Sequence, residues 1–274
     1  MCKPKHFDVV HYKLNDHMLM QRSVNKKLAT TQWEGLVNKI LNKRINIDMI
    51  KPEKNLVDMV FAANGGLIHK KNAFISNFTA VPRRHEHDAY KKYFSQNDYN
   101  VITLPKDMKF EGAGDALFSH NKTYLWIGHG FRTDKKSANY IRDSLSIKES
   151  IQSVHVISLK LVDPLFYHLD TCFCPLSNGS VMIYKPAFSD DSLDKIYAHF
   201  GESGVIAVSS ADAKNFACNS IYSDADGKKN IIGHKFSNEL KERLTKRGYT
   251  VEENNMSEFL LAGGSVKCSV LDID

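Results

Sequence analysis

The stretch Phe110-Glu111-Gly112-Ala113-Gly114-Asp115 leads from an apolar residue into a glycine-punctuated turn, and four similar transitions occur elsewhere in the chain. Successive transitions are separated by 49, 56, 50 and 50 residues, and their apolar residues are Phe61, Phe110, Phe166, Phe216 and Val266. A period of about 50 residues is too long for helical solenoids and is typical of propeller-like arrays whose modules hold strands and one helix. If the chain holds five such modules, one turn from each is expected at a shared axis, near residues 64, 111, 168, 219 and 268. Coincidental spacing in an ordinary α/β sheet is the alternative.

The apolar residues between these turns predict a mixed α/β architecture. Thr31-Gln32-Trp33-Glu34 has the pattern of a capping box, so we expect a helix over residues 31–42. Two further helices are predicted, one after Ser189 and one that stops at Gly248. Short β-type runs cover residues 101–104, 124–127, 154–157, 181–184 and 205–208. No linker rich in Pro, Gly or Ser separates these elements, so we expect a single domain over residues 1–274.

Composition and charge limit the classes to which the chain can belong. Of its 274 residues, 42% are hydrophobic and 25% are charged, as in soluble globular proteins. No run approaches the ~18 apolar residues of a membrane span, so we expect no membrane partner. The net charge of +6 is dispersed, which predicts no nucleic-acid partner. The 5 cysteines lack the spacing of a secreted disulfide framework, so we expect reduced thiols in a cytoplasmic protein.

Three side chains in the repeated turns supply the groups needed for covalent cysteine catalysis. Cys268 offers a thiol, His168 an imidazole and Glu111 a carboxylate. A zinc site made by His168 with Cys172, Cys174 and Cys218 is an alternative use of the cysteines. The Cys-x-Cys pair departs from the usual spacing of zinc ligands, so we expect thiols that pack in the core and no metal.

The same turns lie in runs that resemble the pentein superfamily of guanidine-modifying enzymes, and look most like its arginine dihydrolase domain. The runs that carry the resemblance are LVDMVFAANGG (56–66), FEGAGDALF (110–118), FYHLDTCFCPL (166–176), NFACN (215–219) and FLLAGGSVKC (259–268). The likeness extends over essentially the whole chain. It implies a five-module α/β propeller with pseudo-fivefold symmetry, a site at its axis and no cofactor.

The resemblance also implies a role for each catalytic group. Cys268 corresponds to the nucleophile, His168 to the general acid and base, and Glu111 to the carboxylate that orients the imidazole. The implied substrate is free L-arginine, attacked at its guanidino carbon to give a covalent thiouronium. Self-association into a homo-oligomer stays open.

Further residues correspond to the substrate-binding positions of the superfamily. Arg83 and Arg132 fall where arginines hold the substrate α-carboxylate, and Asp170 falls where a carboxylate grips the guanidinium. Asp58 and Asn15 also fall at substrate-contact positions, although the run around Asn15 is shifted relative to the dihydrolase pattern.

Asn64 separates the dihydrolases from their relatives, because deiminases and dimethylarginine hydrolases carry Asp at this position. An Asp side chain can only accept hydrogen bonds when ionised, whereas the Asn amide can also donate to the carbonyl oxygen of citrulline. Asn64 therefore favours an arginine dihydrolase that produces ornithine, carbon dioxide and two ammonia. The alternatives are an arginine deiminase that stops at citrulline, a dimethylarginine dimethylaminohydrolase, an amidinotransferase and a catalytically silent binding protein of the same fold.

Overall fold

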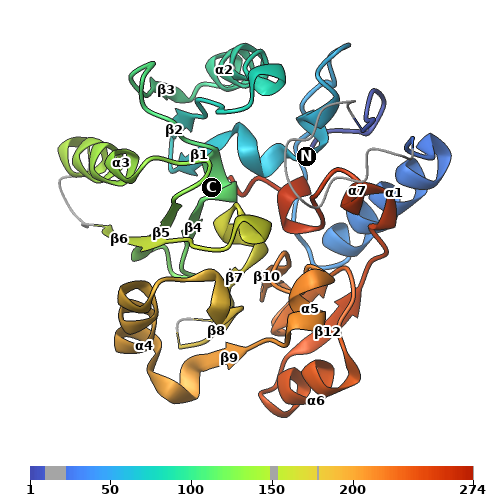
Figure 1. Cartoon of the computed structure of the whole chain (residues 1–274). Helices are drawn as coiled ribbons and strands as arrows, with labels where there is room; N and C mark the ends of the chain where they lie inside the picture. Colours follow the sequence, from blue (N-terminus) through green and yellow to red (C-terminus); the bar gives the residue numbers. More distant parts are fainter. Residues whose placement is uncertain (10–22, 149–153, 178, 274) are drawn as a thin grey trace.

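Four small sheets form the framework of the protein (Figure 1). The computed structural model describes residues 1–9, 23–148, 154–177 and 179–273. In every sheet the first two strands pair antiparallel and the third strand lies parallel to the second. The strands are β1 (Gly66–His69), β2 (Asn72–Ile75) and β3 (Asn100–Thr103); β4 (Ala116–Phe118), β5 (Tyr124–His129) and β6 (His155–Lys160); β7 (Phe173–Pro175), β8 (Val181–Ile183) and β9 (Val205–Ala207); β10 (Ile221–Ser223), β11 (Asn230–Gly233) and β12 (Thr250–Glu253).

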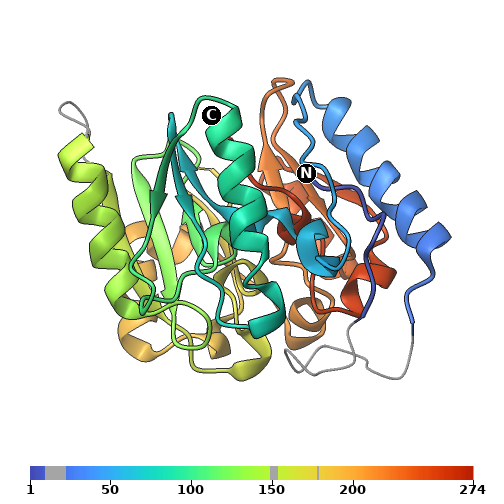
Figure 2. The same cartoon turned by 90° about the horizontal axis from the view of Figure 1, so that it is seen from above.

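A helix connects the second strand of each sheet to the third. These crossover helices are α2 (Glu86–Gln96), α3 (Lys135–Lys148), α4 (Asp190–Gly204) and α6 (Asn238–Lys246). Figure 1 shows them at the rim of the molecule, with β1, β4, β7 and β10 nearer the centre, and Figure 2 shows the same arrangement from above. A ββαβ unit is thus repeated four times. The mixed α/β class and the five predicted strand runs are confirmed.

Among the described residues, three other helices lie outside these crossovers: α1 (Lys26–Leu41), α5 (Ser210–Lys214) and α7 (Ser257–Leu260). Helix α1 begins five residues before the predicted start at Thr31. Its cap is Asn25, whose side chain accepts the Leu28 N–H at 3.0 Å. Thr31 lies inside the helix, where its hydroxyl donates to Lys27 O, so the capping-box pattern does not mark the start. Trp33, Leu36 and Ile40 form the buried face.

Short 3₁₀ turns lie at or next to four of the five repeat positions. Residues of η2 approach η4 and η8, and η4 approaches η6 and η8. The fifth position, Asn219, contacts Cys268 in η8, so the predicted convergence of the turns is confirmed. Gly112 in η4 has a φ of 58°, a conformation that favours glycine. The 3₁₀ turns are η1 (Val57–Val60), η2 (Ala62–Gly65), η3 (Val81–Arg83), η4 (Gly112–Gly114), η5 (Pro164–Phe166), η6 (Leu169–Thr171), η7 (Lys185–Ala187) and η8 (Lys267–Ser269).

Two features of the structure concern possible membrane spans and the state of the cysteines. Within the four described stretches of the chain, no helix has the length and apolar character needed to cross a bilayer. All 5 cysteines are buried free thiols.

Candidate active site

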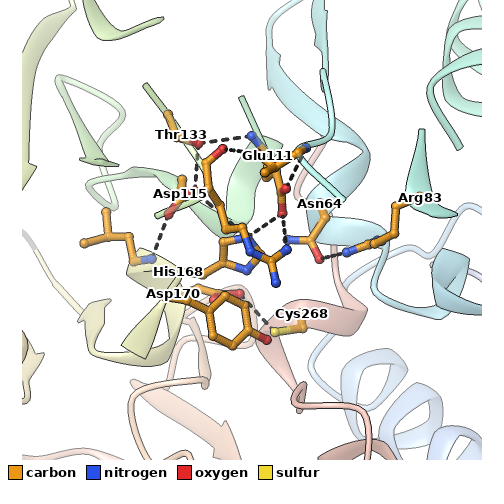
Figure 3. A network of polar contacts seen from close by, with 12 residues as sticks. Asn64, Arg83, Glu111, Asp115, Thr133, His168, Asp170 and Cys268 are labelled. Carbon is orange, nitrogen blue, oxygen red and sulfur yellow. Dashed lines mark hydrogen bonds and ion pairs between the residues drawn. The ribbon is translucent and has the colours of Figure 1, made fainter. Parts of the chain in front are cut away.

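A small cavity lies where the repeated turns meet (Figure 3). Its volume is about 20 Å³, which is room for about one water molecule. Cys268 and His168 line it, and Glu111 contacts His168 from a fully buried position. The three predicted catalytic groups are therefore brought together from η8, the residue before η6 and the residue before η4. The described lining residues are Asp58, Phe61, Asn64, Arg83, Arg132, Tyr167, His168, Ala262, Gly263, Gly264 and Cys268.

Glu111 holds the imidazole of His168. Its Oε2 atom lies 2.8 Å from His168 Nε2 and 3.1 Å from Arg132 Nη1, while Oε1 accepts the Thr79 N–H at 3.0 Å. Burial opposes ionisation, but the charge of Arg132 and the hydrogen bond with His168 outweigh it and lower the pKa of Glu111 to about 2. Glu111 is therefore ionised at neutral pH. A carboxylate so placed fixes the orientation of the imidazole.

Asp115 supports His168 from a second direction. Its Oδ1 atom accepts the Leu169 N–H at 3.0 Å, which fixes the backbone next to His168. Its Oδ2 atom accepts the Thr133 hydroxyl at 2.7 Å and lies 3.9 Å from His168 Nε2. Burial raises the pKa of Asp115 to about 6, against the lowering effects of His168 and Thr133.

The Cys268 thiol lies between a carboxylate and an amide. Its Sγ atom is 3.2 Å from Asp170 Oδ2 and accepts the Asn219 Nδ2–H at 3.0 Å. Burial, followed by the charge of Asp170, raises the pKa of Cys268 well above its ordinary value. Burial also raises the pKa of Asp170 to about 7, although the thiol hydrogen bond and Lys267 act in the opposite direction. The neutral thiol is thus favoured until a cation binds nearby. Asp170 Oδ1 has no hydrogen-bond partner among the residues described, so it can accept from such a cation.

An ion pair fixes the orientation of Asn64. Arg83 Nη1 donates to Asn64 Oδ1 at 2.8 Å, and Arg83 is itself held by both oxygens of Glu86 at 2.9 and 2.8 Å. A guanidinium can only donate hydrogen bonds, so the amide atom of Asn64 that faces Arg83 is the oxygen. Asn64 Nδ2 has no partner within the described part of the chain. A Cβ atom at Gly114 would clash with Asn64 Nδ2 and lie 3.3 Å from His168 Nδ1, so glycine leaves room for this donor beside the imidazole.

The other predicted substrate contacts are placed as follows. Arg83, Arg132 and Asp58 line the cavity. The Arg132 guanidinium stacks 4.7 Å from the centre of the Tyr167 ring. Burial raises the pKa of Asp58, and the positive charges of Arg83 and Arg132 oppose that rise. Asn15 lies outside the described residues.

Sequence reasoning missed three residues that shape the site. Glu86 lies in the VPRRHEH run and clamps Arg83, while Tyr167 donates its hydroxyl to Gly263 O at 2.6 Å. Asn219 contacts both Cys268 and Asp170. Only Asn219 had a signal of its own, because it stands at the fourth position of the predicted converging turns.

The cysteines behind the site lie in the core. Cys172, Cys174 and Cys218 are buried, and Cys174 Sγ donates to Ser220 O at 3.4 Å. In the part of the chain that the structure covers, no three His, Cys, Asp or Glu side chains are grouped as a metal ion would require.

Comparison with known proteins gives close relatives over the whole chain. The protein is 40% identical to the bifunctional arginine dihydrolase/ornithine cyclodeaminase AgrE of Nostoc sp. (strain PCC 7120 / SAG 25.82 / UTEX 2576) over 276 aligned residues, covering 100% of this chain and 37% of that relative. It therefore spans about a third of the length of that bifunctional protein. It is also 34% identical to N(G),N(G)-dimethylarginine dimethylaminohydrolase of Mycobacterium tuberculosis (strain ATCC 25618 / H37Rv), covering 98% of this chain and 84% of that relative.

A solved structure extends this similarity to three dimensions. The N-terminal domain of ArgZ, in an Asn-to-Ser variant covalently bound to a reaction intermediate, superposes with a TM-score of 0.91 at 40% identity, covering 99% of this chain and 95% of that one. The mixed α/β fold is thus that of a pentein structure. The family model described as eukaryotic N,N dimethylarginine dimethylhydrolase matches residues 4–274. On the match to this model and the identity to full-span relatives, the chain belongs to the N,N dimethylarginine dimethylhydrolase family of the pentein superfamily.

Proposed function

We propose that the protein is a cysteine-dependent hydrolase of free L-arginine, of the arginine dihydrolase type. The observation that carries this proposal is the oriented amide of Asn64, whose Nδ2 donor lies beside His168 and has no partner among the described residues. The overall reaction consumes two water molecules and converts arginine to ornithine, carbon dioxide and two ammonia. The 40% identity to a bifunctional arginine dihydrolase supports the same assignment.

In the first round Cys268 attacks the guanidino carbon. The incoming guanidinium donates one hydrogen bond to Asp170 Oδ1, which has no partner among the described residues. It donates a second to Asp170 Oδ2, where it replaces the hydrogen bond from the Cys268 thiol. A cation beside the sulfur lowers the pKa of the thiol, so the thiolate forms where it is needed. His168 takes the thiol proton and passes it to the departing ammonia; it then takes a proton from water, which hydrolyses the thiouronium to citrulline and releases Cys268.

In the second round the ureido group of citrulline is attacked in the same way. Asn64 Nδ2 donates to the ureido oxygen, which an Asp at this position would repel. Arg83 keeps this donor in place because it occupies Asn64 Oδ1. Loss of the second ammonia and hydrolysis of the resulting thiocarbamate release ornithine and carbon dioxide.

The end of the substrate away from the guanidinium carries an α-carboxylate and an α-ammonium group. We assign the α-carboxylate to Arg83 and Arg132, the α-ammonium to the buried carboxylate of Asp58, and a further contact to Asn15. Because the cavity of about 20 Å³ is far smaller than arginine, side chains that line it must move when the substrate enters.

Product analysis with L-arginine labelled at the guanidino carbon tests the proposal. Wild type should give ornithine, labelled carbon dioxide and two ammonia, and Cys268→Ser should give none of these. Asn64→Asp should release citrulline, because the first round is retained and the second is lost. Citrulline as the end product of wild type would make the protein a deiminase, and Asn64→Asp that accumulates no more citrulline than wild type would remove the role of Asn64.

The family model favours one second candidate, hydrolysis of dimethylarginine to citrulline and dimethylamine. The same assay with dimethylarginine separates the two. Methyl groups on the guanidino nitrogen need apolar space, whereas Asn64 and Asp170 present polar atoms there. We therefore expect L-arginine to be turned over and dimethylarginine to be a poor substrate.

We further propose that the four ββαβ units and a fifth sector complete a single-domain, five-module propeller with pseudo-fivefold symmetry. Cys2 and Ile50 form a parallel bridge, and α1 lies between them in sequence, as a crossover helix does in the other units. The segment 270–273 lines the same pocket as Met1 and Ile50, where a first strand of that sector would lie. A cytoplasmic location agrees with the reduced thiols, and a homo-oligomer remains part of the proposal to be measured by sedimentation.

A further inference from the structure

Asn219 binds the nucleophile at two points. It lies in the turn before β10 and is completely buried. Its Oδ1 atom accepts the Cys268 N–H at 3.2 Å, and its Nδ2 atom donates to Cys268 Sγ at 3.0 Å and to Asp170 O at 3.1 Å. Its carbonyl accepts the Lys267 N–H at 3.2 Å. One residue therefore links the backbone of η8, the sulfur and the segment that carries the guanidinium-binding carboxylate.

The backbone before Asn219 is held in a costly conformation. Phe216 has a φ of 59° and is buried, although a bulky side chain rarely adopts this region. The Asn219 N–H donates to Phe216 O at 2.9 Å, so this conformation determines how Asn219 is presented. Such strain persists where surrounding packing enforces it and is concentrated at functional sites.

Burial and Asp170 oppose a negative charge on the Cys268 sulfur, whereas a backbone hydrogen bond from Ser265 favours it. The thiol is buried, and its acceptor Asp170 carries the same charge that a thiolate would. A thiolate in such a site needs hydrogen-bond donors, and Asn219 Nδ2 is a donor already within 3.0 Å of Sγ.

We propose that Asn219 is a positioning residue for the Cys268 thiolate, with Nδ2 stabilising the charge on sulfur and Oδ1 fixing the backbone that carries it. This inference rests on the proposed function, in which Cys268 is the nucleophile. Asn219 does not line the cavity among the described residues, so it acts on the substrate through Cys268.

The test measures the reactivity of Cys268 without any substrate. The rate of alkylation by iodoacetamide is followed between pH 6 and pH 11, and peptide mass spectrometry separates Cys268 from the four other buried thiols. A hydrogen bond to a charged group shifts the pKa by about one unit, so Asn219→Ala should slow alkylation at pH 8 roughly tenfold and move the profile to higher pH. Asn219→Asp keeps the acceptor for Cys268 N–H but replaces the donor by a negative charge, and should slow alkylation further.

A control in the same turn isolates the contact with sulfur. Asn215 is exposed and its amide donates to Ala211 O at 3.0 Å, so Asn215→Asp should leave the alkylation profile unchanged. In steady-state assays Asn219→Ala should lower kcat for L-arginine and leave KM nearly constant. An alkylation midpoint that is the same in Asn219→Ala and wild type overturns the proposal, even if turnover falls. A shifted midpoint in a protein that does not turn over arginine would overturn the proposed function and leave this inference standing.

If neither Asn219 variant folds, the proposal is tested on the wild-type protein by NMR. The side-chain amide resonances of Asn219, followed by ¹⁵N NMR, should move with the same pH midpoint as Cys268 alkylation. Resonances that do not respond to ionisation of the sulfur would contradict the proposed contact.

Discussion

Replacing Asp170 by Asn should abolish turnover and, at neutral pH, stabilise the fold. Asp170 is completely buried and burial raises its pKa from 3.8 to about 7. The rise of about 3 units corresponds to roughly 4 kcal/mol, which is an upper limit for a buried group. The folded protein therefore carries a carboxylate whose ionisation it disfavours, and the proposed role of this carboxylate is to bind the substrate guanidinium.

The sign of the pH dependence follows from the two pKa values. Below about pH 4, Asp170 is protonated in both the folded and the unfolded chain, and the raised pKa has no effect on stability. Between about pH 4 and pH 7 the unfolded chain has lost this proton and the folded protein retains it, so the free energy of unfolding falls as pH rises. Above pH 7 both states are ionised and the penalty is constant. Asn at this position has no such penalty at any pH.

Urea unfolding of wild type and Asp170→Asn, at intervals from pH 4 to pH 8, measures the effect. The difference in free energy of unfolding, variant minus wild type, should increase across this range by as much as about 4 kcal/mol. Asp194→Asn removes an exposed carboxylate from α4 and serves as the control, with a difference that does not follow this trend. A difference for Asp170→Asn that is independent of pH would refute the reasoning, because the buried carboxyl would then not retain its proton.

Two further substitutions test the support of the site. Glu111→Gln should lower kcat by roughly 10³- to 10⁴-fold, because His168 loses the carboxylate that orients it, and steady-state kinetics would contradict this if kcat were retained. Since the pKa of Glu111 is lowered to about 2, the stability it contributes is present above about pH 4.5 and lost toward pH 2. Tyr167→Phe leaves the buried Gly263 carbonyl without its 2.6 Å partner and should cost about 1–3 kcal/mol in urea unfolding, with unchanged stability as the contrary result.

The repeat of about 50 residues predicted the arrangement of the site better than any single motif. Phe61, Phe110 and Phe166 each precede a 3₁₀ turn, and each turn leads into the first strand of a sheet. A residue at the same place in every unit reaches the same side of the molecule. This is why Glu111, His168 and Cys268, far apart in sequence, meet at one cavity.

Local patterns were less informative where tertiary packing decides the structure. The strands that lead out of the turns, such as β4 (Ala116–Phe118), are only three or four residues long and mostly buried, so no alternation of polar and apolar residues marks them. Helix α2 was not predicted, because His85 at its cap makes no side-chain hydrogen bond and most of its residues are charged or polar. The bonds of Asn219 could not be read from the sequence either, since they join residues 49 positions apart.

In the proposed function, the charges of the site bind an amino acid with a cationic side chain. Asp170 and the thiol of Cys268 both have raised pKa values, and both become easier to ionise beside a guanidinium. Arg83 and Arg132 hold positive charge near Asp58, and Arg132 also pairs with Glu111 next to His168. Binding and ionisation are linked. A bound guanidinium lowers these pKa values, and ionisation of the two groups in turn makes the site bind the guanidinium more tightly. Under the proposed function, the Cys268 thiol is therefore activated when a guanidinium is in place, and stays neutral until then.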